Sequence, residues 1–163
     1  MRLLLFYLVL ITVQGFLSAL LTPLPPPDLF FVAVLTLLWR LPPWQLVAVA
    51  YGVGLLQDVF GHGVLGVHAL ALATGALAAA GARAQLTGAG VFERLLVVTV
   101  GMVGKWVVMI AMLAWLSGTG ILWEDTAAVA TIETLFTVAL AMLLLPWANA
   151  LIERTATLRK GLL

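Results

Sequence analysis

VLGVHALALATGALAAAGA, residues 64–82, contains no charged side chain and ends immediately before Arg83. An α-helix needs ~20 predominantly apolar residues to cross the hydrocarbon core of a bilayer, and this segment has about that length. Its residues therefore predict a transmembrane helix rather than the core helix of a water-soluble domain.

The composition of the whole chain supports the same class. Of 163 residues, 64% are hydrophobic and only 9% are charged, against roughly 25% charged residues in a soluble domain. Because the chain contains no cysteine, disulfides, thiolate metal sites and a cysteine nucleophile are excluded. The net charge of +1 and the absence of a basic run argue against nucleic-acid binding.

Five further apolar segments lie on either side of residues 64–82, and each is predicted to be helical. Residues 64–82 are the fourth of the six segments in chain order. The other five cover 3–22, Leu29–Trp39, Trp44 to about Asp58, Leu95–Leu116, and about Ala127–Ala150. Prolines at 23 and 25–27, the break at 40–43, the glycines at 61, 63 and 66, and polar loops at 85–94 and 117–125 separate them. The first segment is interpreted as a retained helix because it lacks a convincing signal-peptide cleavage site.

The sequence thus predicts one polytopic domain over residues 1–163, an all-α bundle of six transmembrane segments. The second and third segments are shorter than a full span. Two interpretations stay open for them: two short tilted helices, or a hairpin that dips into the membrane and returns. Either interpretation leaves the fourth segment with the same orientation.

Basic residues orient the bundle. With both termini inside, every Lys or Arg outside the bilayer lies on the cytoplasmic side, as the positive-inside rule favours. They are Arg2, Arg40, Arg83, Arg94, Arg154, Arg159 and Lys160, whereas the external loops hold Asp28, Asp58, Glu124 and Asp125. We therefore expect an N-in, C-in multi-pass protein of a bacterial inner membrane.

No pattern in the sequence predicts an enzyme. The only serines are Ser18 and Ser117, neither within a Gly-x-Ser-x-Gly motif, and metalloprotease and nucleotide-binding motifs are absent. Asp58, His62 and His68 resemble metal ligands, but the glycines beside His62 interrupt the helix that the spacing would need. The favoured interpretation is a polar turn at the external face with His68 packed inside the bundle, and no metal or cofactor.

Small residues form two predicted helix faces. Ala71, Gly75 and Ala79 recur every four residues in the fourth segment, and Ala48 and Gly52 do so in the third. Such faces let membrane helices approach closely. We favour packing within this bundle, with the docking of a partner's transmembrane helix as the alternative.

Lys105 and Glu133 lie well inside the fifth and sixth segments. A charge at that depth costs several kcal/mol unless it is paired or hydrated, so it is a candidate functional group. Because a short external loop joins the two segments, the two side chains are predicted to form an ion pair between adjacent antiparallel helices. A structural pair is favoured over a role in transport or partner binding.

Residues Gly54–Leu70, GLLQDVFGHGVLGVHAL, resemble the signature stretch of the rod shape-determining protein MreD family. In that family Gly-x-x-x-Asp leads into a small-residue turn and then Leu-Gly. Pro27-Asp28-Leu29 and the Arg40-Leu41-Pro42 break are similar too, whereas Ala50 stands where the family often has glycine. Length and hydropathy agree along nearly the whole chain, but the specific motif covers only about residues 27–70.

The resemblance implies a non-catalytic scaffold of the machinery that elongates the lateral cell wall. Its implied partners are an MreC-like single-span protein and, through it, an MreB filament, a RodA-like glycosyltransferase and a class B penicillin-binding protein. The motif also implies a structural turn made by Gly54, Asp58, Leu65 and Gly66, in which Asp58 accepts backbone N–H bonds. Asp28 is expected to cap the second helix.

MreD-like bundles are also similar to the substrate-binding subunits of energy-coupling-factor transporters, which leaves a small-molecule-binding membrane subunit as the alternative function. A vitamin pocket needs several convergent polar groups, and few are expected within these spans. A third possibility, an ion or proton pathway, would use Lys105 and Glu133, but one pair does not make a relay.

Overall fold

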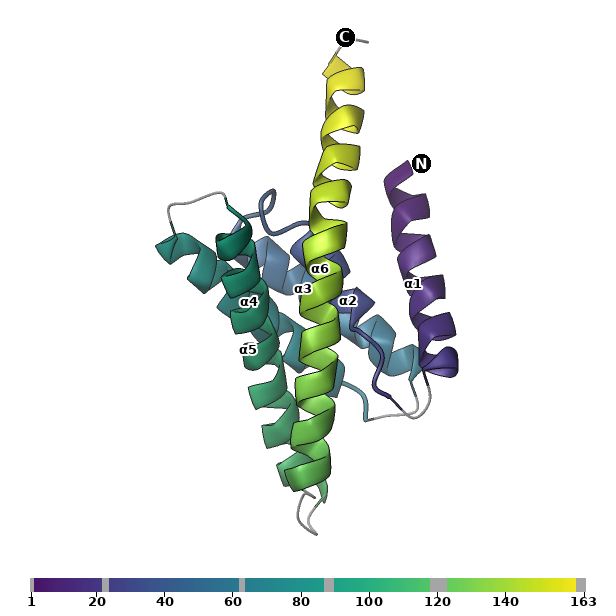
Figure 1. Ribbon diagram of the computed structural model, residues 1–163, viewed down its shortest axis with the longest axis vertical. Coiled ribbons are helices and arrows are strands. Elements are labelled where there is room, and N and C mark those ends of the chain that lie inside the picture. Colours follow the sequence, from purple (N-terminus) through teal and green to yellow (C-terminus); the bar gives the residue numbers. More distant parts are fainter. Residues whose placement is uncertain (1, 22–23, 62–63, 87–89, 118–122, 161–163) are drawn as a thin grey trace.

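The computed structural model describes residues 2–21, 24–61, 64–86, 90–117 and 123–160, with side chains given for most of residues 8–148. All regular structure in these ranges is helical. The helices are α1 (Arg2–Leu20), α2 (Leu29–Leu35), α3 (Pro43–Phe60), α4 (Val67–Gln85), α5 (Val91–Ser117) and α6 (Trp123–Lys160). The N-terminal end of α1 and the C-terminal end of α6 lie on the same side of the molecule (Figure 1).

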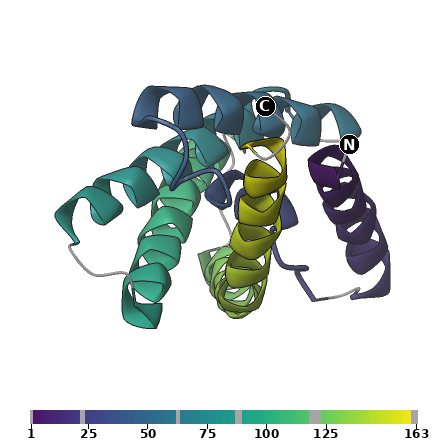
Figure 2. The ribbon, with the colours of Figure 1, turned by 90° about the horizontal axis from the view of Figure 1, so that it is seen from above.

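Three helices are long and apolar enough to cross a membrane, namely α4, α5 and the part of α6 from Trp123 to Ala148. A shorter apolar stretch, Ile11–Leu20, belongs to α1. The protein therefore has the helices of a membrane protein. α5 and α6 run side by side for much of their length, and α1 stands on the far side of α6 from α5 (Figures 1 and 2).

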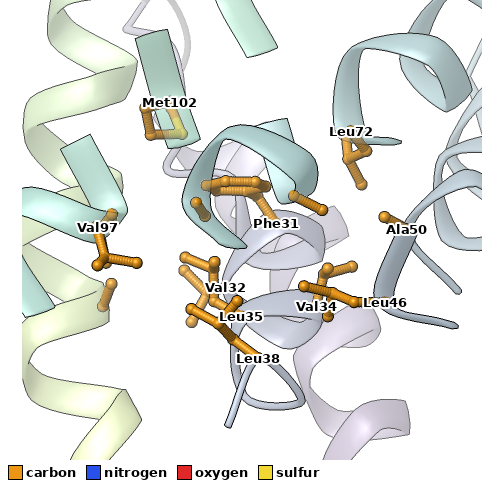
Figure 3. Packing of buried hydrophobic residues seen from close by; sticks show 14 of the residues in the cluster. Phe31, Val32, Val34, Leu35, Leu38, Leu46, Ala50, Leu72, Val97 and Met102 are labelled. Carbon is orange, nitrogen blue, oxygen red and sulfur yellow. The ribbon is translucent and has the colours of Figure 1, made fainter. Parts of the chain in front are cut away.

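The second predicted segment is only partly helical. Its α-helix, α2, has seven residues, all of them buried, and hydrogen-bonded turns continue the chain to Leu41. Seven residues rise about 10 Å, far less than the hydrocarbon thickness, so α2 cannot span a membrane as a helix. It instead forms the centre of the bundle, where Phe31, Leu35 and Leu38 belong to the main hydrophobic cluster (Figure 3).

α3 lies across one side of the other helices (Figure 2). One of its faces, formed by Leu46, Ala50, Gly54 and Asp58, is buried, and these residues recur every four positions as a helix face requires. The opposite face is exposed. α3 is thus packed on one side only, mainly against α4.

α4 and α5 meet through small residues. A Cβ added to Gly75 would lie 2.9 Å from the carbonyl oxygen of Gly101, and one added to Gly104 would lie 2.8 Å from the Cβ of Ala78. These approaches allow close contact of the two backbones, which is how membrane helices gain packing energy without a hydrophobic driving force. Ala71, Gly75 and Ala79 therefore pack inside the bundle, as favoured from the sequence.

Several helix ends differ from the sequence prediction. The predicted loop at 85–94 is shorter, because α5 already begins at Val91, and α6 begins at Trp123 within the predicted loop at 117–125. α4 begins at Val67 rather than at residue 64, because Gly66 has φ +98° and cannot belong to a right-handed helix. α6 also continues past the predicted end near Ala150 to Lys160, and it passes through Pro146.

Candidate functional site

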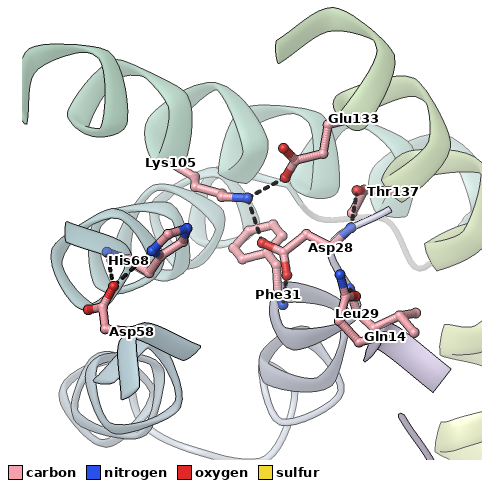
Figure 4. A network of polar contacts seen from close by, with 9 residues as sticks. All are labelled: Gln14, Asp28, Leu29, Phe31, Asp58, His68, Lys105, Glu133 and Thr137. Carbon is pink, nitrogen blue, oxygen red and sulfur yellow. Dashed lines mark hydrogen bonds and ion pairs between the residues drawn. The ribbon is translucent and has the colours of Figure 1, made fainter. Parts of the chain in front are cut away.

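Lys105 lies at the centre of a buried network of charges (Figure 4). Its side chain is 3% exposed, and its Nζ lies 2.5 Å from Oδ2 of Asp28 and forms a second ion pair with Oε1 of Glu133. The ring of Trp106 adds a cation–π contact, with 5.7 Å between Nζ and the ring centroid. Burial of an isolated ammonium would be very costly, and the two carboxylates offset that cost.

Asp28 is the member of this network that the sequence analysis did not place there. As expected it caps α2, because its Oδ1 accepts a hydrogen bond of 2.9 Å from the backbone N–H of Phe31. Its other oxygen faces Lys105, 77 positions away in the chain. The sequence carried one signal for this contact: Lys105 is the single cation within the spans, whereas acidic residues occur at several of their ends.

The backbone around Asp28 is held by two more helices. The N–H of Asp28 donates to Oγ1 of Thr137 on α6, at 2.8 Å, and the N–H of Leu29 donates to Oε1 of Gln14 on α1, also at 2.8 Å. These N–H groups open a helix and have no partner within it. The start of α2 is therefore fixed by side chains of α1, α5 and α6 together.

A second acidic group, Asp58, closes the connection between α3 and α4. Its Oδ2 accepts from the backbone N–H groups of Gly66, at 2.8 Å, and Ala69, at 3.2 Å. Its Oδ1 accepts from the N–H of His68, at 3.1 Å, and lies 2.8 Å from Nδ1 of the same residue. Asp58 is 3% exposed, so these contacts replace the water that a free carboxylate would bind.

Gly54 and Leu65 behave differently within this turn. A Cβ on Gly54 would lie 2.4 Å from the Cα of Ala69 and 2.6 Å from the carbonyl oxygen of His68, so the two helices cross where only hydrogen fits. Leu65, in contrast, is 69% exposed.

The expected inward packing of His68 is only partial, since its side chain is 32% exposed. His62 lies outside the described residues.

A cavity of about 420 Å³ is lined by the network around Lys105 and by His68, the partner of Asp58. Its lining includes Gln14, Asp28, Gln57, His68, Lys105, Trp106 and Glu133. Within the described part of the chain, Gln57 Oε1 and Trp106 Nε1 are buried and have no hydrogen-bond partner. These two atoms, one acceptor and one donor, are suited to a polar ligand or to water.

No family model, curated protein or solved structure matches this chain. Among the described residues, no three His, Asp or Glu side chains are grouped as a metal site would require.

The interior holds more polar groups than the sequence analysis expected. That expectation counted the residues within each apolar segment and found few. The structure brings them together, because Gln14, Gln57, His68 and Lys105 come from α1, α3, α4 and α5 and line one cavity. The structure therefore differs from the expectation that few polar groups converge within the spans.

The two small-residue faces also have different surroundings. Gly75 is buried against α5, whereas Gly52 has no atom within 4 Å of an added Cβ, and Ala48 is exposed as well. Trp44 and Leu56 continue the open face along α3, with exposed fractions of 70% and 49%. Of the two predicted faces, the one on α3 can receive another helix.

Proposed function

We propose that this protein is a non-catalytic membrane scaffold of the MreD type, which binds the transmembrane helix of an MreC-like partner during lateral cell-wall synthesis. The observation that carries the proposal is the open face of α3, defined by Trp44, Ala48, Gly52 and Leu56. Small residues at its centre would let a partner's backbone approach closely, and larger apolar side chains flank them.

The residues of Gly54–Leu70, the stretch that resembles the MreD family, support a structural role. Gly54 fits the crossing of α3 and α4, and the carboxylate of Asp58 is occupied by backbone N–H groups of α4. A group so engaged is not available as a general base. The stretch therefore holds α3 against α4 and leaves the outer face of α3 for recognition.

Co-purification with an MreC-like single-span protein tests this proposal. We expect Gly52→Leu to reduce recovery of the complex about tenfold or more, because the added side chain separates the two backbones. Gly81→Leu is the matched control, since Gly81 is also an exposed helical glycine with nothing within 4 Å of an added Cβ. Equal recovery of the complex with both variants, each folded, would rule out the α3 face.

We further propose an N-in, C-in orientation in a bacterial inner membrane, with α1 and the α2–α3 pair crossing in addition to the three long helices. The distribution of Lys and Arg supports it. Single cysteines can be placed in this cysteine-free chain at Gln85, after the fourth predicted segment, and at Glu124, before the sixth. An impermeant maleimide added outside should label position 124 and not position 85, and the reverse pattern would refute the orientation.

A small-molecule-binding membrane subunit is the second candidate, and the cavity lined by Gln57 and Trp106 favours it. Polar groups that converge in an otherwise apolar interior are typical of ligand sites. Mass spectrometry of protein purified from membranes would detect a retained metabolite. We expect none under the scaffold proposal; retention that Gln57→Met abolishes, with partner binding intact, would favour the second function instead.

A further inference from the structure

A second cavity, of about 460 Å³, lies where the α2–α3 connection meets α4 and α5. Its apolar lining includes Leu38, Leu41 and Leu46, and its charged lining consists of Arg83 and Glu93. It is separate from the network around Lys105. A cavity with one cation, one anion and a hydrophobic wall is suited to an amphiphile that carries both charges.

Glu93 provides the clearest indication of a ligand. It is 8% exposed, and its Oε2 is buried with no hydrogen-bond partner among the described residues. Its position in the first turn of α5 explains why a negative charge is tolerated there, because the helix dipole favours acids at that end. The dipole does not satisfy Oε2, which still requires a donor.

Arg83 is the cationic residue of the cavity lining. Its Nη1 donates to the carbonyl oxygen of Leu38 at 2.6 Å, and its guanidinium carbon lies 5.7 Å from the ring centroid of Trp39. These two contacts restrain a group that carries five N–H donors, of which one is hydrogen-bonded within the described part of the chain. A guanidinium fixed in this way is suited to a phosphate.

We propose that this cavity binds the headgroup of a zwitterionic aminophospholipid, with the phosphate at Arg83 and the primary ammonium at Glu93. The acyl chains would follow the leucine-lined wall toward the lipid. Arg and Trp at helix ends are typical of the membrane interface, where such headgroups lie. The site goes beyond the proposed scaffold function and does not depend on it.

The charges predict a selectivity order. An anionic lipid such as phosphatidylglycerol would satisfy Arg83, but its headgroup offers Glu93 only neutral hydroxyl donors and no positive charge to pair with the carboxylate. A choline lipid keeps the positive charge but has no N–H to donate to Oε2. We therefore expect binding to decrease from phosphatidylethanolamine to phosphatidylcholine to phosphatidylglycerol when the acyl chains are identical.

Native mass spectrometry of the detergent-solubilised full chain, with each lipid added in turn, measures this order without any substitution. We expect phosphatidylethanolamine to bind about tenfold more tightly than phosphatidylglycerol, the size of one charged hydrogen bond. Glycerophosphoethanolamine, which has the same headgroup and no acyl chains, should bind much more weakly. Equal binding of that soluble compound, or a preference for phosphatidylglycerol, would overturn the proposal.

Two substitutions then assign the charges. Glu93→Gln should remove the preference for phosphatidylethanolamine, whereas Arg83→Gln should weaken binding of all three phospholipids. Glu124→Gln and Arg94→Gln are the controls, since neither residue lines this cavity. An unchanged preference in folded Glu93→Gln would refute the role of Glu93, and if a variant does not fold, the order measured on the unaltered chain still decides the question.

Discussion

Asp58 and Lys105 are both buried charges, but the protein accommodates them in different ways. Asp58 is bound by backbone N–H groups 8 to 11 positions further along the chain, so its contacts form as soon as α3 and α4 meet. Lys105 depends on Asp28 and Glu133, which lie 77 and 28 positions away. The first region is a local turn, and the second exists only when α2, α5 and α6 are assembled.

Because Asp58 is bound mainly by backbone N–H groups and Lys105 by two carboxylates, we expect only the region around Lys105 to depend on complete charge pairing. Backbone N–H groups are neutral, so the loss of Asp58 leaves polar groups without an acceptor but strands no charge. The loss of Lys105 leaves two carboxylates facing each other in a low-dielectric interior. Removal of one partner from a buried ion pair is much more costly than removal of the whole set.

The largest effect is expected for Lys105→Met, with a loss of about 3–5 kcal/mol in the free energy of unfolding. The triple variant Lys105→Met, Asp28→Asn, Glu133→Gln should recover part of that loss, because no stranded charge is left. Thermal unfolding in detergent, followed by circular dichroism, measures the triple variant and each of its three single variants. Losses that simply add across the three positions would show that the residues are not coupled.

Asp58→Asn is expected to cost about 1.5–3 kcal/mol, the value for a hydrogen bond to a charged group. An asparagine keeps one acceptor oxygen but turns an NH₂ group toward backbone donors. Asp58→Glu should not restore stability, since the longer side chain no longer matches the positions of Gly66 and Ala69. A fully stable Asp58→Asn variant that fails only to bind its partner would instead assign Asp58 to recognition.

Gly54→Ala is expected to cost about 1–3 kcal/mol, because the new methyl group overlaps backbone atoms of Ala69 that cannot rotate away. Gly52→Ala, two residues earlier on the open face of α3, is the control. There the methyl group meets nothing, and alanine favours the helix over glycine by about 0.5–1 kcal/mol. The same unfolding measurement should give opposite signs for the two variants, and equal signs would contradict the close crossing of α3 and α4.

The smallest effect is expected for Gln57→Met. This change removes a buried acceptor that has no partner among the described residues and keeps the volume of the side chain. Stability should stay the same or rise by about 1 kcal/mol, since the cost of an unsatisfied group disappears. A clear loss of stability would show that Gln57 Oε1 is satisfied by bound water or a ligand in the purified protein.

Features that depend on neighbours in the chain could be predicted from the sequence. Long, predominantly apolar segments predicted the helices α4, α5 and α6, because span length follows from bilayer thickness. Asp28 was recognised as the cap of α2, and Gly66 as part of a turn, because both roles are played by residues next to the helix end. The polar turn at Asp58 could be predicted for the same reason, because its hydrogen-bond donors lie only 8 to 11 positions further along the chain.

Which helix faces meet became known from the packing of the helices in three dimensions. This packing placed the Gly75 face against α5 and left the Gly52 face open, although both have the same spacing of small residues. It gave Lys105 a second carboxylate, that of Asp28, and gathered polar side chains of separate helices around one cavity. These outcomes depend on the rotation and crossing of whole helices, and a pattern repeated along one helix does not specify what lies opposite.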